Sequence, residues 1–388
     1  MTKQISVLGC TGSIGRQSLD VIASHPEEMA LFGIAANRDV EKLVEQTNTY
    51  HPRVIACETE FDASRLPDGT DAIMGKGATE QLAAMTEADV VVNGVSGFAA
   101  LGPLVASLKA GKRVALANKE SIVCGKSLID RILQEYHGAI LPVDSEQSAI
   151  FQCLQNGRKE EVDKLILTAS GGPFWRKNRE ELDAITPEQA LAHPTWNMGK
   201  KITIDSATLF NKGLEVIEAA YLFDLPAEQI DVVIHPQSIV HSMVSYRDGT
   251  CMANMSKPDM RLPIQYAITY PARAASSCQT LLLYNEQPLT FHKPDFERFH
   301  SLKMAFDALK TGLSCPLVYN GANEAAVEAF CSGSIGFLDI ERVVDYTLNQ
   351  HTPVAFNSLE EIMEADRLAR DEANGWIARI SQERRNRY

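Results

Sequence analysis

The segment ISVLGCTGSIG, residues 5–15, decides the fold of the first third of the chain. Its first four residues form an apolar run typical of a buried strand, and Gly9, Gly12 and Gly15 follow at G-x-x-G-x-x-G spacing. Residues 16–24 then repeat apolar side chains at helical spacing, so the segment predicts a strand, a tight turn and a helix, the opening of a βαβ unit. Such a turn brings backbone N–H groups close to a pyrophosphate. Because G-x-G-x-x-G is the commoner spacing, a turn without a ligand remains the alternative.

The end of the second predicted strand, residues 31–36, carries the signal for the type of cofactor. Asn37, Arg38 and Asp39 follow it. An acidic side chain there would hold the ribose hydroxyls of NAD, whereas an arginine pairs with the extra phosphate of NADP. Arg38 favours NADP, and Asp39 is expected to cap the helix that begins with Val40. An arginine solvated at a helix start is the alternative.

Three further apolar runs, 54–56, 88–92 and 113–116, predict parallel strands covered on both faces. The first third therefore has the pattern of a Rossmann-like, doubly wound sheet. Ligands of such sheets bind beyond the carboxyl ends of the strands. We expect three polar segments along that edge: Asn93-Gly-Val-Ser-Gly97, Asn118-Lys119-Glu120 and Asp144-Ser145-Glu146.

Asp144 and Glu146 are candidate metal ligands. In an extended segment their spacing of two residues projects both carboxylates to one side. Carboxylate ligands suit Mg²⁺ or Mn²⁺. The alternative is that Ser145 and Glu146 cap a helix starting near Gln147, with Asp144 as a turn residue.

A third carboxylate, Glu215, lies in a segment predicted to be a helix that opens at Ser206. Asn211 shares its face, and Lys212 lies three positions before it. Hydroxyl, amide and ammonium donors suit a phosphate or phosphonate group. A solvated, charged helix face is the alternative.

Two segments between these carboxylates add to the site. The apolar run at 165–169 ends in Ser170-Gly-Gly, which could offer a second set of donors to an anion. A capping box at Thr186 precedes the loop 192–201, whose large apolar side chains stand between proline and glycine. This loop predicts a lid that excludes water. Packing of Trp196 and Met198 on a neighbouring element is the alternative.

Composition limits the partners. The 388 residues are 45% hydrophobic and carry a net charge of −13. The negative charge argues against nucleic acid or anionic lipid as the main partner, because both bind basic surfaces. No apolar run is long enough to cross a bilayer, and the chain starts on a strand-like segment, so we expect a cytoplasmic protein. The eight cysteines show no C-x-x-C pair and are expected to be reduced, with Cys10 packed inside the glycine turn.

The later chain predicts a central α/β domain, a linker and a helical end. Strands are expected between 230 and 255, with a hairpin turn at Asp248-Gly249. His235 and His241 are expected to be structural or interface residues. The segment 276–298 is irregular, and 299–388 shows helical periodicity.

The chain resembles the 1-deoxy-D-xylulose 5-phosphate reductoisomerase family over essentially its whole length. The resemblance is carried by GCTGSIG (9–15), ALANKES (115–121), LPVDSEQSA (141–149), TASGGPF (168–174), HPTWNMGKKITIDSATLFNKGLEVIEA (193–219) and VIHPQSIVHSMV (233–244). It implies an NADPH-binding domain over 1–144, a catalytic, metal-binding and dimerising domain with the lid over 145–275, a linker over 276–298 and a C-terminal helical bundle over 299–388. It also implies a homodimer.

The resemblance assigns roles by position. Catalytic roles fall on Lys119, Asp144, Glu146, His193 and Glu215; the Mg²⁺ or Mn²⁺ ligands are Asp144, Glu146 and Glu215. Substrate contacts fall on Ser145, Glu146, Ser170, His193, Trp196, Met198, Ser206, Asn211, Lys212 and Glu215. NADPH contacts fall on Thr11, Gly12, Ser13, Ile14, Asn37, Arg38, Asp39, Asn118, Glu120 and Gly199. Asn37-Arg38-Asp39 departs from a Gly-Lys-Asn type sequence but keeps the cation.

The reaction implied is the metal-dependent rearrangement of 1-deoxy-D-xylulose 5-phosphate and its reduction by NADPH to 2-C-methyl-D-erythritol 4-phosphate. One alternative is another two-domain NADP oxidoreductase, such as a semialdehyde or homoserine dehydrogenase, which would not need three carboxylates. The other is a catalytically silent dinucleotide sensor.

Overall fold

The computed structural model describes residues 2–192 and 199–386. They form two compact units: unit 1 is Met1–Ser121, Ile129–Ser148 and Asp259–Gln279, and unit 2 is Ile122–Leu128, Ala149–Pro258 and Thr280–Tyr388. Within the described ranges, no helix combines the length and the apolar character that crossing a membrane requires.

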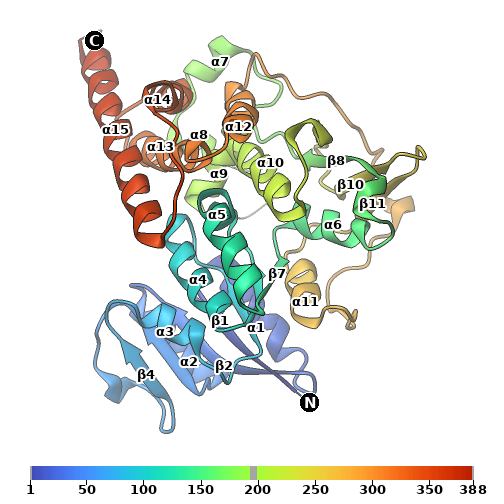
Figure 1. The fold of residues 1–388 in the computed structure, drawn as a ribbon, viewed down its shortest axis with the longest axis vertical. Coiled ribbons are helices and arrows are strands. Elements are labelled where there is room, and N and C mark those ends of the chain that lie inside the picture. Colours follow the sequence, from blue (N-terminus) through green and yellow to red (C-terminus); the bar gives the residue numbers. More distant parts are fainter. Residues whose placement is uncertain (1, 193–198, 387–388) are drawn as a thin grey trace. The chain divides into compact units, whose positions relative to one another are not determined.

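Unit 1 is built on a parallel seven-stranded sheet (Figure 1). Its strands are β1 Lys3–Leu8, β2 Met29–Ala36, β3 Val54–Cys57, β4 Asp71–Met74, β5 Val90–Asn93, β6 Arg113–Leu116 and β7 Ala139–Pro142. The order β4-β3-β2-β1-β5-β6-β7 reverses direction between β1 and β5. This confirms the doubly wound sheet, and ligands of such sheets bind at the point where the strand order reverses.

The helices of unit 1 cover a sheet whose central strands are buried along their whole length, as β3 and β5 show. They are α1 Ser13–Ala23, α2 Val40–Tyr50, α3 Ala78–Ala84, α4 Leu101–Lys109 and α11 Arg261–Thr269, and helix α5 Lys119–Glu135 follows β6. Helix α3 packs against α4, and α1 packs against α11. Leu82 of α3 and Val54 of β3 belong to one buried apolar cluster.

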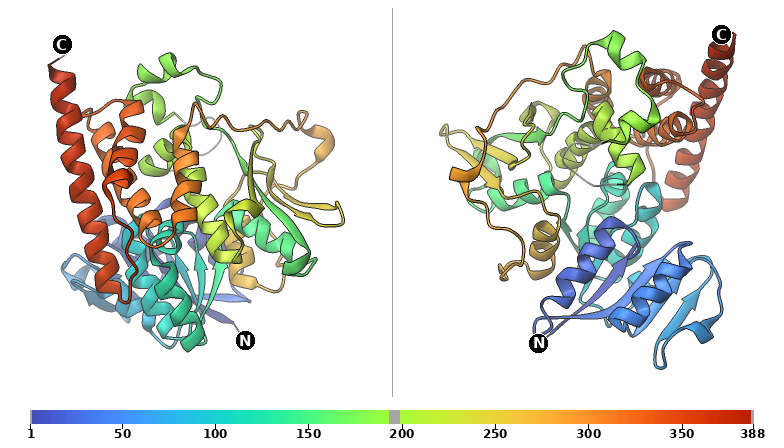
Figure 2. Two further views of the ribbon diagram at one scale, coloured as in Figure 1. Left: turned by 45° about the horizontal axis from the view of Figure 1, so that its top comes forward. Right: turned by 180° about the vertical axis from the view of Figure 1, so that it is seen from behind.

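Unit 2 contains a mixed sheet and the remaining helices (Figure 2). Strands β8 Val162–Ala169, β9 Ile230–Ile234, β10 Val240–Tyr246 and β11 Cys251–Met255 lie in the order β11-β10-β8-β9, with β8 and β9 parallel. Between β8 and β9 in the chain lie the helices α7 Arg179–Asp183, α8 Pro187–Ala190, α9 Lys200–Thr208 and α10 Phe210–Phe223, and α6 Ser145–Leu154 precedes β8. Val216 of α10 packs with Leu165 and Val232 of the sheet in one core.

The C-terminal part is helical, as predicted. Its helices are α12 His300–Thr311, α13 Cys315–Cys331, α14 Phe337–Gln350 and α15 Leu359–Arg385, and α13 packs against both α14 and α15 (Figure 1). Short 3-10 turns complete the chain: η1 Ala63–Arg65, η2 Phe98–Ala100, η3 Lys159–Glu161, η4 Ala227–Gln229 and η5 Leu283–Asn285.

Three expectations about local structure were wrong. Helix α1 begins at Ser13 rather than residue 16, because Gly12 takes the extended N-cap conformation. Strand β4 was not predicted; it is a short edge strand, Asp-Ala-Ile-Met, whose residues are exposed or half-buried. The helix expected to open at Ser206 is two helices, α9 and α10, broken at Leu209 in the left-handed conformation (φ 61°). Ser206 therefore lies near the end of α9.

Candidate active site

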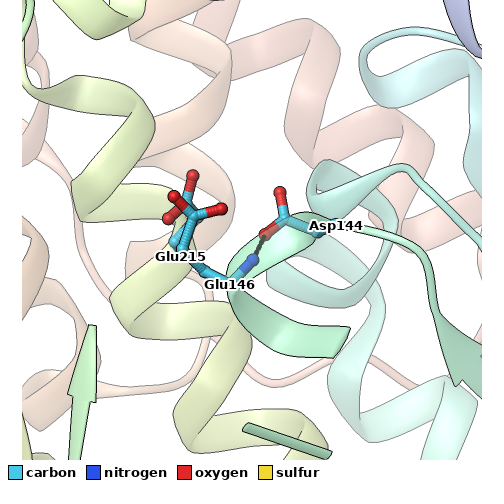
Figure 3. A group of neighbouring side chains, drawn as sticks. All are labelled: Asp144, Glu146 and Glu215. Atoms are coloured by element: carbon cyan, nitrogen blue, oxygen red, sulfur yellow. Dashed lines mark hydrogen bonds between the residues drawn. The ribbon is translucent and has the colours of Figure 1, made fainter. Parts of the chain in front are cut away.

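Three carboxylates come together although their residues are up to 71 positions apart in the sequence. Asp144, Glu146 and Glu215 each offer an oxygen, and these oxygens lie within 4.8 Å of one another. In Figure 3, Glu215 projects from a turn of its helix and the three carboxyl groups gather in one place. Three hard oxygen donors at this spacing fit Mg²⁺ or Mn²⁺.

Asp144 stands between β7 and α6 and serves two structural roles. Its Oδ1 accepts hydrogen bonds from the backbone N–H of Glu146 (3.2 Å) and of Gln147 (3.4 Å), so it caps α6. Its Oδ2 pairs with Lys119 Nζ at 2.9 Å, and these side chains are 9% and 6% exposed. The expectation of an extended segment was wrong, since α6 begins at Ser145. The alternative, that this segment caps a helix, is correct except that Asp144 is the cap in place of Ser145 and Glu146. Asp144 caps the helix and also belongs to the group of three carboxylates.

Glu215 lies on α10 with two donors from the same helix. Asn211 Nδ2 donates to its Oε1 at 2.5 Å, and Lys212 Nζ donates to its Oε2. Lys212 and Glu215 are 4% and 1% exposed, so their charges are neutralised inside the protein. Lys212 Nζ also donates to the carbonyl of Thr168 at 2.5 Å, which ties α10 to the end of β8.

The predicted phosphate-binding residues converge from three elements of unit 2. Ser170 follows β8, and its Oγ accepts a hydrogen bond from Gly172 N–H at 3.2 Å. Gly172 has φ +67°, and a Cβ there would lie 2.6 Å from the carbonyl oxygen of Ser206. Only glycine permits this approach of the turn to α9. Since Lys212 reaches Thr168, two residues before Ser170, the structure brings the β8 end together with α9 and α10.

The predicted lid residues His193, Trp196 and Met198 lie outside the described residues. The structure describes the residues on either side of them. Thr186 accepts from Gln189 N–H in the capping box of α8, as predicted, and Gly199 is the exposed N-cap of α9.

The glycine turn lies where the sheet order reverses. A Cβ on Gly9 would lie 2.7 Å from the carbonyl of Gly94, which follows β5, so the two loops are in close contact. A Cβ on Gly15, in the first turn of α1, would lie 2.3 Å from the carbonyl oxygen of Gly9. Thr11, Gly12, Ser13 and Ile14 thus occupy the turn and the start of α1, where helical N–H groups have no partner within the helix and attract an anion.

At the end of β2, Asn37 and Arg38 are exposed. The prediction that Asp39 caps α2 is confirmed, since its side chain accepts from Lys42 N–H. Asp39 Oδ2 also pairs with Lys42 Nζ at 2.6 Å. The carboxylate is therefore engaged by its own helix.

Asn118 and Glu120 are buried where β6 leads into α5. Asn118 Oδ1 caps α5 by accepting from Ser121 N–H at 2.8 Å, and its Nδ2 donates to Gly97 O (2.9 Å) and Glu120 Oε2 (2.8 Å). The loop after β5 and the start of α5 are thereby held together at the carboxyl edge of the sheet.

Sequence reasoning missed one set of supporting residues. Asp205, next to Ser206, accepts from Asn323 Nδ2 of α13 at 2.8 Å and pairs with Lys201 at 2.6 Å. This anchors α9 to the helical bundle. Asn323 is fully buried, and an amide among the apolar residues of its helix was the available signal.

The remaining expectations concern histidines and cysteines. His235 Nδ1 donates to the carbonyl of Thr290 (2.9 Å) while its Nε2 accepts from Ile239 and Val240 N–H, which is a structural role. Cys10 is fully buried, and burial raises the pKa of its thiol to about 12, which favours packing over chemistry.

Comparisons with known proteins agree along the whole chain. The family model described as "1-deoxy-D-xylulose 5-phosphate reductoisomerase" matches residues 5–126. The models for the "1-deoxy-D-xylulose 5-phosphate reductoisomerase C-terminal domain" and the "DXP reductoisomerase C-terminal domain" match residues 140–223 and 255–372.

Curated relatives of the same name include the 1-deoxy-D-xylulose 5-phosphate reductoisomerases of Chlorobium limicola, 49% identical, and Desulforamulus reducens, 48% identical. Each alignment covers 96% of this chain and 98% of the relative.

Solved structures show the same fold. The Zymomonas mobilis reductoisomerase in complex with NADPH is 38% identical, with a TM-score of 0.90 over 97% of this chain and 99% of that one. A DOX-P reductoisomerase in complex with NADPH, fosmidomycin and magnesium is 36% identical, with a TM-score of 0.90 over 97% and 98% of the two chains.

Proposed function

The chain belongs to the 1-deoxy-D-xylulose 5-phosphate reductoisomerase family, and we propose that Asp144, Glu146 and Glu215 form its metal centre. The protein is an NADPH- and divalent-metal-dependent enzyme that rearranges and reduces 1-deoxy-D-xylulose 5-phosphate to 2-C-methyl-D-erythritol 4-phosphate. The observation that carries the proposed centre is the grouping of three carboxylate oxygens within 4.8 Å. A bound Mg²⁺ or Mn²⁺ supplies Lewis-acid chemistry to adjacent hydroxyl and carbonyl oxygens of a substrate.

Lys119 holds Asp144 in position for this role. Its ammonium lies 2.9 Å from Oδ2 while the other carboxylate oxygen caps α6, so the side chain has little rotational freedom. Ser145 and Glu146 follow at once in the first turn of α6. We assign these residues to the reacting end of the substrate, where Lys119 also offers a positive charge.

The phosphate of the substrate is assigned to Ser170, Ser206, Asn211 and Lys212. Since Lys212 and Asn211 both donate to Glu215, the phosphate-binding residues and the third metal ligand form one connected set. Binding energy from a phosphate remote from the reacting carbons holds the substrate while its skeleton is rearranged. The proposed lid residues His193, Trp196 and Met198 would exclude water from the bound substrate.

NADPH is assigned to the crevice at the β1–β5 reversal, with its pyrophosphate on Thr11, Gly12, Ser13 and Ile14. The segment Asn37-Arg38-Asp39 at the end of β2 would lie next to the 2′-phosphate, with Arg38 as its cation and the Asp39 carboxylate held by α2. Asn118, Glu120 and Gly199 are assigned to the rest of the cofactor.

The division of labour along the chain is part of the same proposal. Residues 1–144 would bind NADPH, 145–275 would hold metal and substrate and form the dimer contact, 276–298 would link, and 299–388 would support the site. A homodimer acting in the cytoplasm completes the proposal; the homodimer is the assembly that the family resemblance implies.

The test follows NADPH absorbance after addition of 1-deoxy-D-xylulose 5-phosphate, with and without Mg²⁺ or Mn²⁺. We expect oxidation only with metal. Glu215→Gln should lower the rate at least about 1000-fold, because a metal centre stabilises the transition state by several kcal/mol. Glu160→Gln, at an exposed position of η3, is the matched control and should keep the rate. Metal-independent oxidation, or equal rates for the two variants, would refute the assignment.

A further inference from the structure

The start of α2 carries two acids where a dianionic phosphate is expected. Asp39 and Glu41 follow Arg38 within three positions. In dinucleotide-binding sheets an acid at this strand end accepts hydrogen bonds from the ribose hydroxyls of NAD and repels the 2′-phosphate of NADP. The presence of two acids therefore conflicts with a preference for NADPH.

Both acids are paired with cations that the sequence motif does not include. Asp39 Oδ2 lies 2.6 Å from Lys42 Nζ, and its Oδ1 accepts from Lys42 N–H at 3.3 Å. Glu41 Oε2 lies 2.6 Å from Arg65 Nη2 of η1. The hydrogen bond from Lys42 holds the pKa of Asp39 below its usual value, so its charge is fully present at neutral pH and must be offset.

Arg38 differs from these cations. Within residues 2–192 and 199–386, no carboxylate forms an ion pair with its guanidinium. Lys42 and Arg65 are paired with Asp39 and Glu41, and Arg65 also faces Asp62. Among these cations, Arg38 is exposed and forms no ion pair with a described residue.

We infer that Lys42 is a specificity-determining residue: its ammonium holds Asp39 Oδ2 and offsets the carboxylate charge, so that Arg38 is presented to a 2′-phosphate and the ribose hydroxyls of NADH find no free carboxylate oxygen. Arg65 offsets Glu41 in the same way. The inference rests on the proposed function, in which the 2′-phosphate binds at Arg38.

The test compares KM for NADPH and for NADH in the wild-type enzyme, Lys42→Met, Asp39→Asn/Lys42→Met and Arg38→Met. Lys42→Met should raise KM for NADPH about three- to fivefold at low ionic strength, the effect expected of one exposed charge pair, with kcat unchanged. KM for NADH should fall or stay constant. The double variant should restore the wild-type KM for NADPH, because it removes the carboxylate that Lys42 offsets. The difference should shrink in 0.5 M salt.

The control is Arg367→Met on α15, which removes a cation paired at 2.6 Å and three positions from Glu364; it should leave both KM values unchanged. An unchanged KM for NADPH in Lys42→Met would overturn the inference. A raised KM that persists in the double variant would also overturn it, since Lys42 would then act on the phosphate directly. If Arg38→Met does not raise KM for NADPH, the 2′-phosphate does not bind at Arg38. If the wild-type enzyme does not oxidise NADPH in the presence of substrate, the proposed function itself is refuted.

Discussion

Two lysine–carboxylate pairs of this chain have the same spacing of three residues and opposite surroundings. Lys212 and Glu215 on α10 are 4% and 1% exposed, whereas Lys42 and Asp39 at the start of α2 are 56% and 38% exposed. Removing one partner of a buried pair leaves an uncompensated charge in the interior, but water replaces the partner of an exposed pair. A lysine and a carboxylate three residues apart therefore stabilise the folded site where they are buried, and we propose that they affect the choice of cofactor where they are exposed.

The largest expected effect tests the buried pair. Lys212→Met should lower the free energy of unfolding by about 3–5 kcal/mol in metal-free buffer, because Glu215 loses its ammonium partner. Urea unfolding followed by circular dichroism measures it. Lys212→Met/Glu215→Gln should recover most of the loss, since no charge is left buried. A single-variant loss below about 1 kcal/mol would mean that the pair is solvated.

Glu341 shows the effect of burial on a carboxylate whose cation is more distant than in these two pairs. Glu341 of α14 is 8% exposed at its side chain, its nearest cation is Arg179 at 3.6 Å, and burial raises its pKa from 4.5 to about 7. The folded state therefore keeps a proton that the unfolded chain releases, and stability falls as pH rises from about 4.5 through 7. Glu341→Gln should remove that slope and stabilise the protein at pH 8 by up to roughly 3 kcal/mol. Urea unfolding between pH 5 and 8 checks this prediction. It would be contradicted if the free energy of unfolding varied with pH in the same way in the wild type and in Glu341→Gln.

The smallest expected effect lies at the exposed pair. Lys42→Met should change the free energy of unfolding by less than about 1 kcal/mol, because the pair is open to water and Asp39 still caps α2. Thermal unfolding of the wild type, Lys42→Met and the control Arg367→Met measures this change. A loss as large as that of Lys212→Met would show that exposure does not separate the two pairs.

Much of the fold could be predicted from the sequence where apolar runs are long. The β1 and β6 segments were predicted because buried parallel strands read as continuous apolar runs. Strand β4 was not predicted because its four residues, at the edge of the sheet and partly exposed, carry only a short apolar run. The break between α9 and α10 at Leu209 was not predicted, because leucine rarely adopts the left-handed conformation. The pattern of residues 206–220 is that of one continuous helix.

The candidate site was predictable in its chemistry and only partly in its geometry. Residue types and the family resemblance identified Asp144, Glu146 and Glu215, which lie together. Local patterns could not show that Asp144 also caps α6, nor that Lys212 reaches the carbonyl of Thr168. Those contacts depend on elements brought together by the fold rather than on neighbours in the sequence.

The most direct test of the metal centre is a Mn²⁺ titration followed by electron paramagnetic resonance, on the wild-type protein, Glu215→Gln and Glu160→Gln. We predict one tight Mn²⁺ per chain in the wild type and in Glu160→Gln, and affinity weakened at least about tenfold, about 1.4 kcal/mol, in Glu215→Gln. Equal Mn²⁺ affinity in all three proteins would contradict the assignment of Glu215 as a metal ligand.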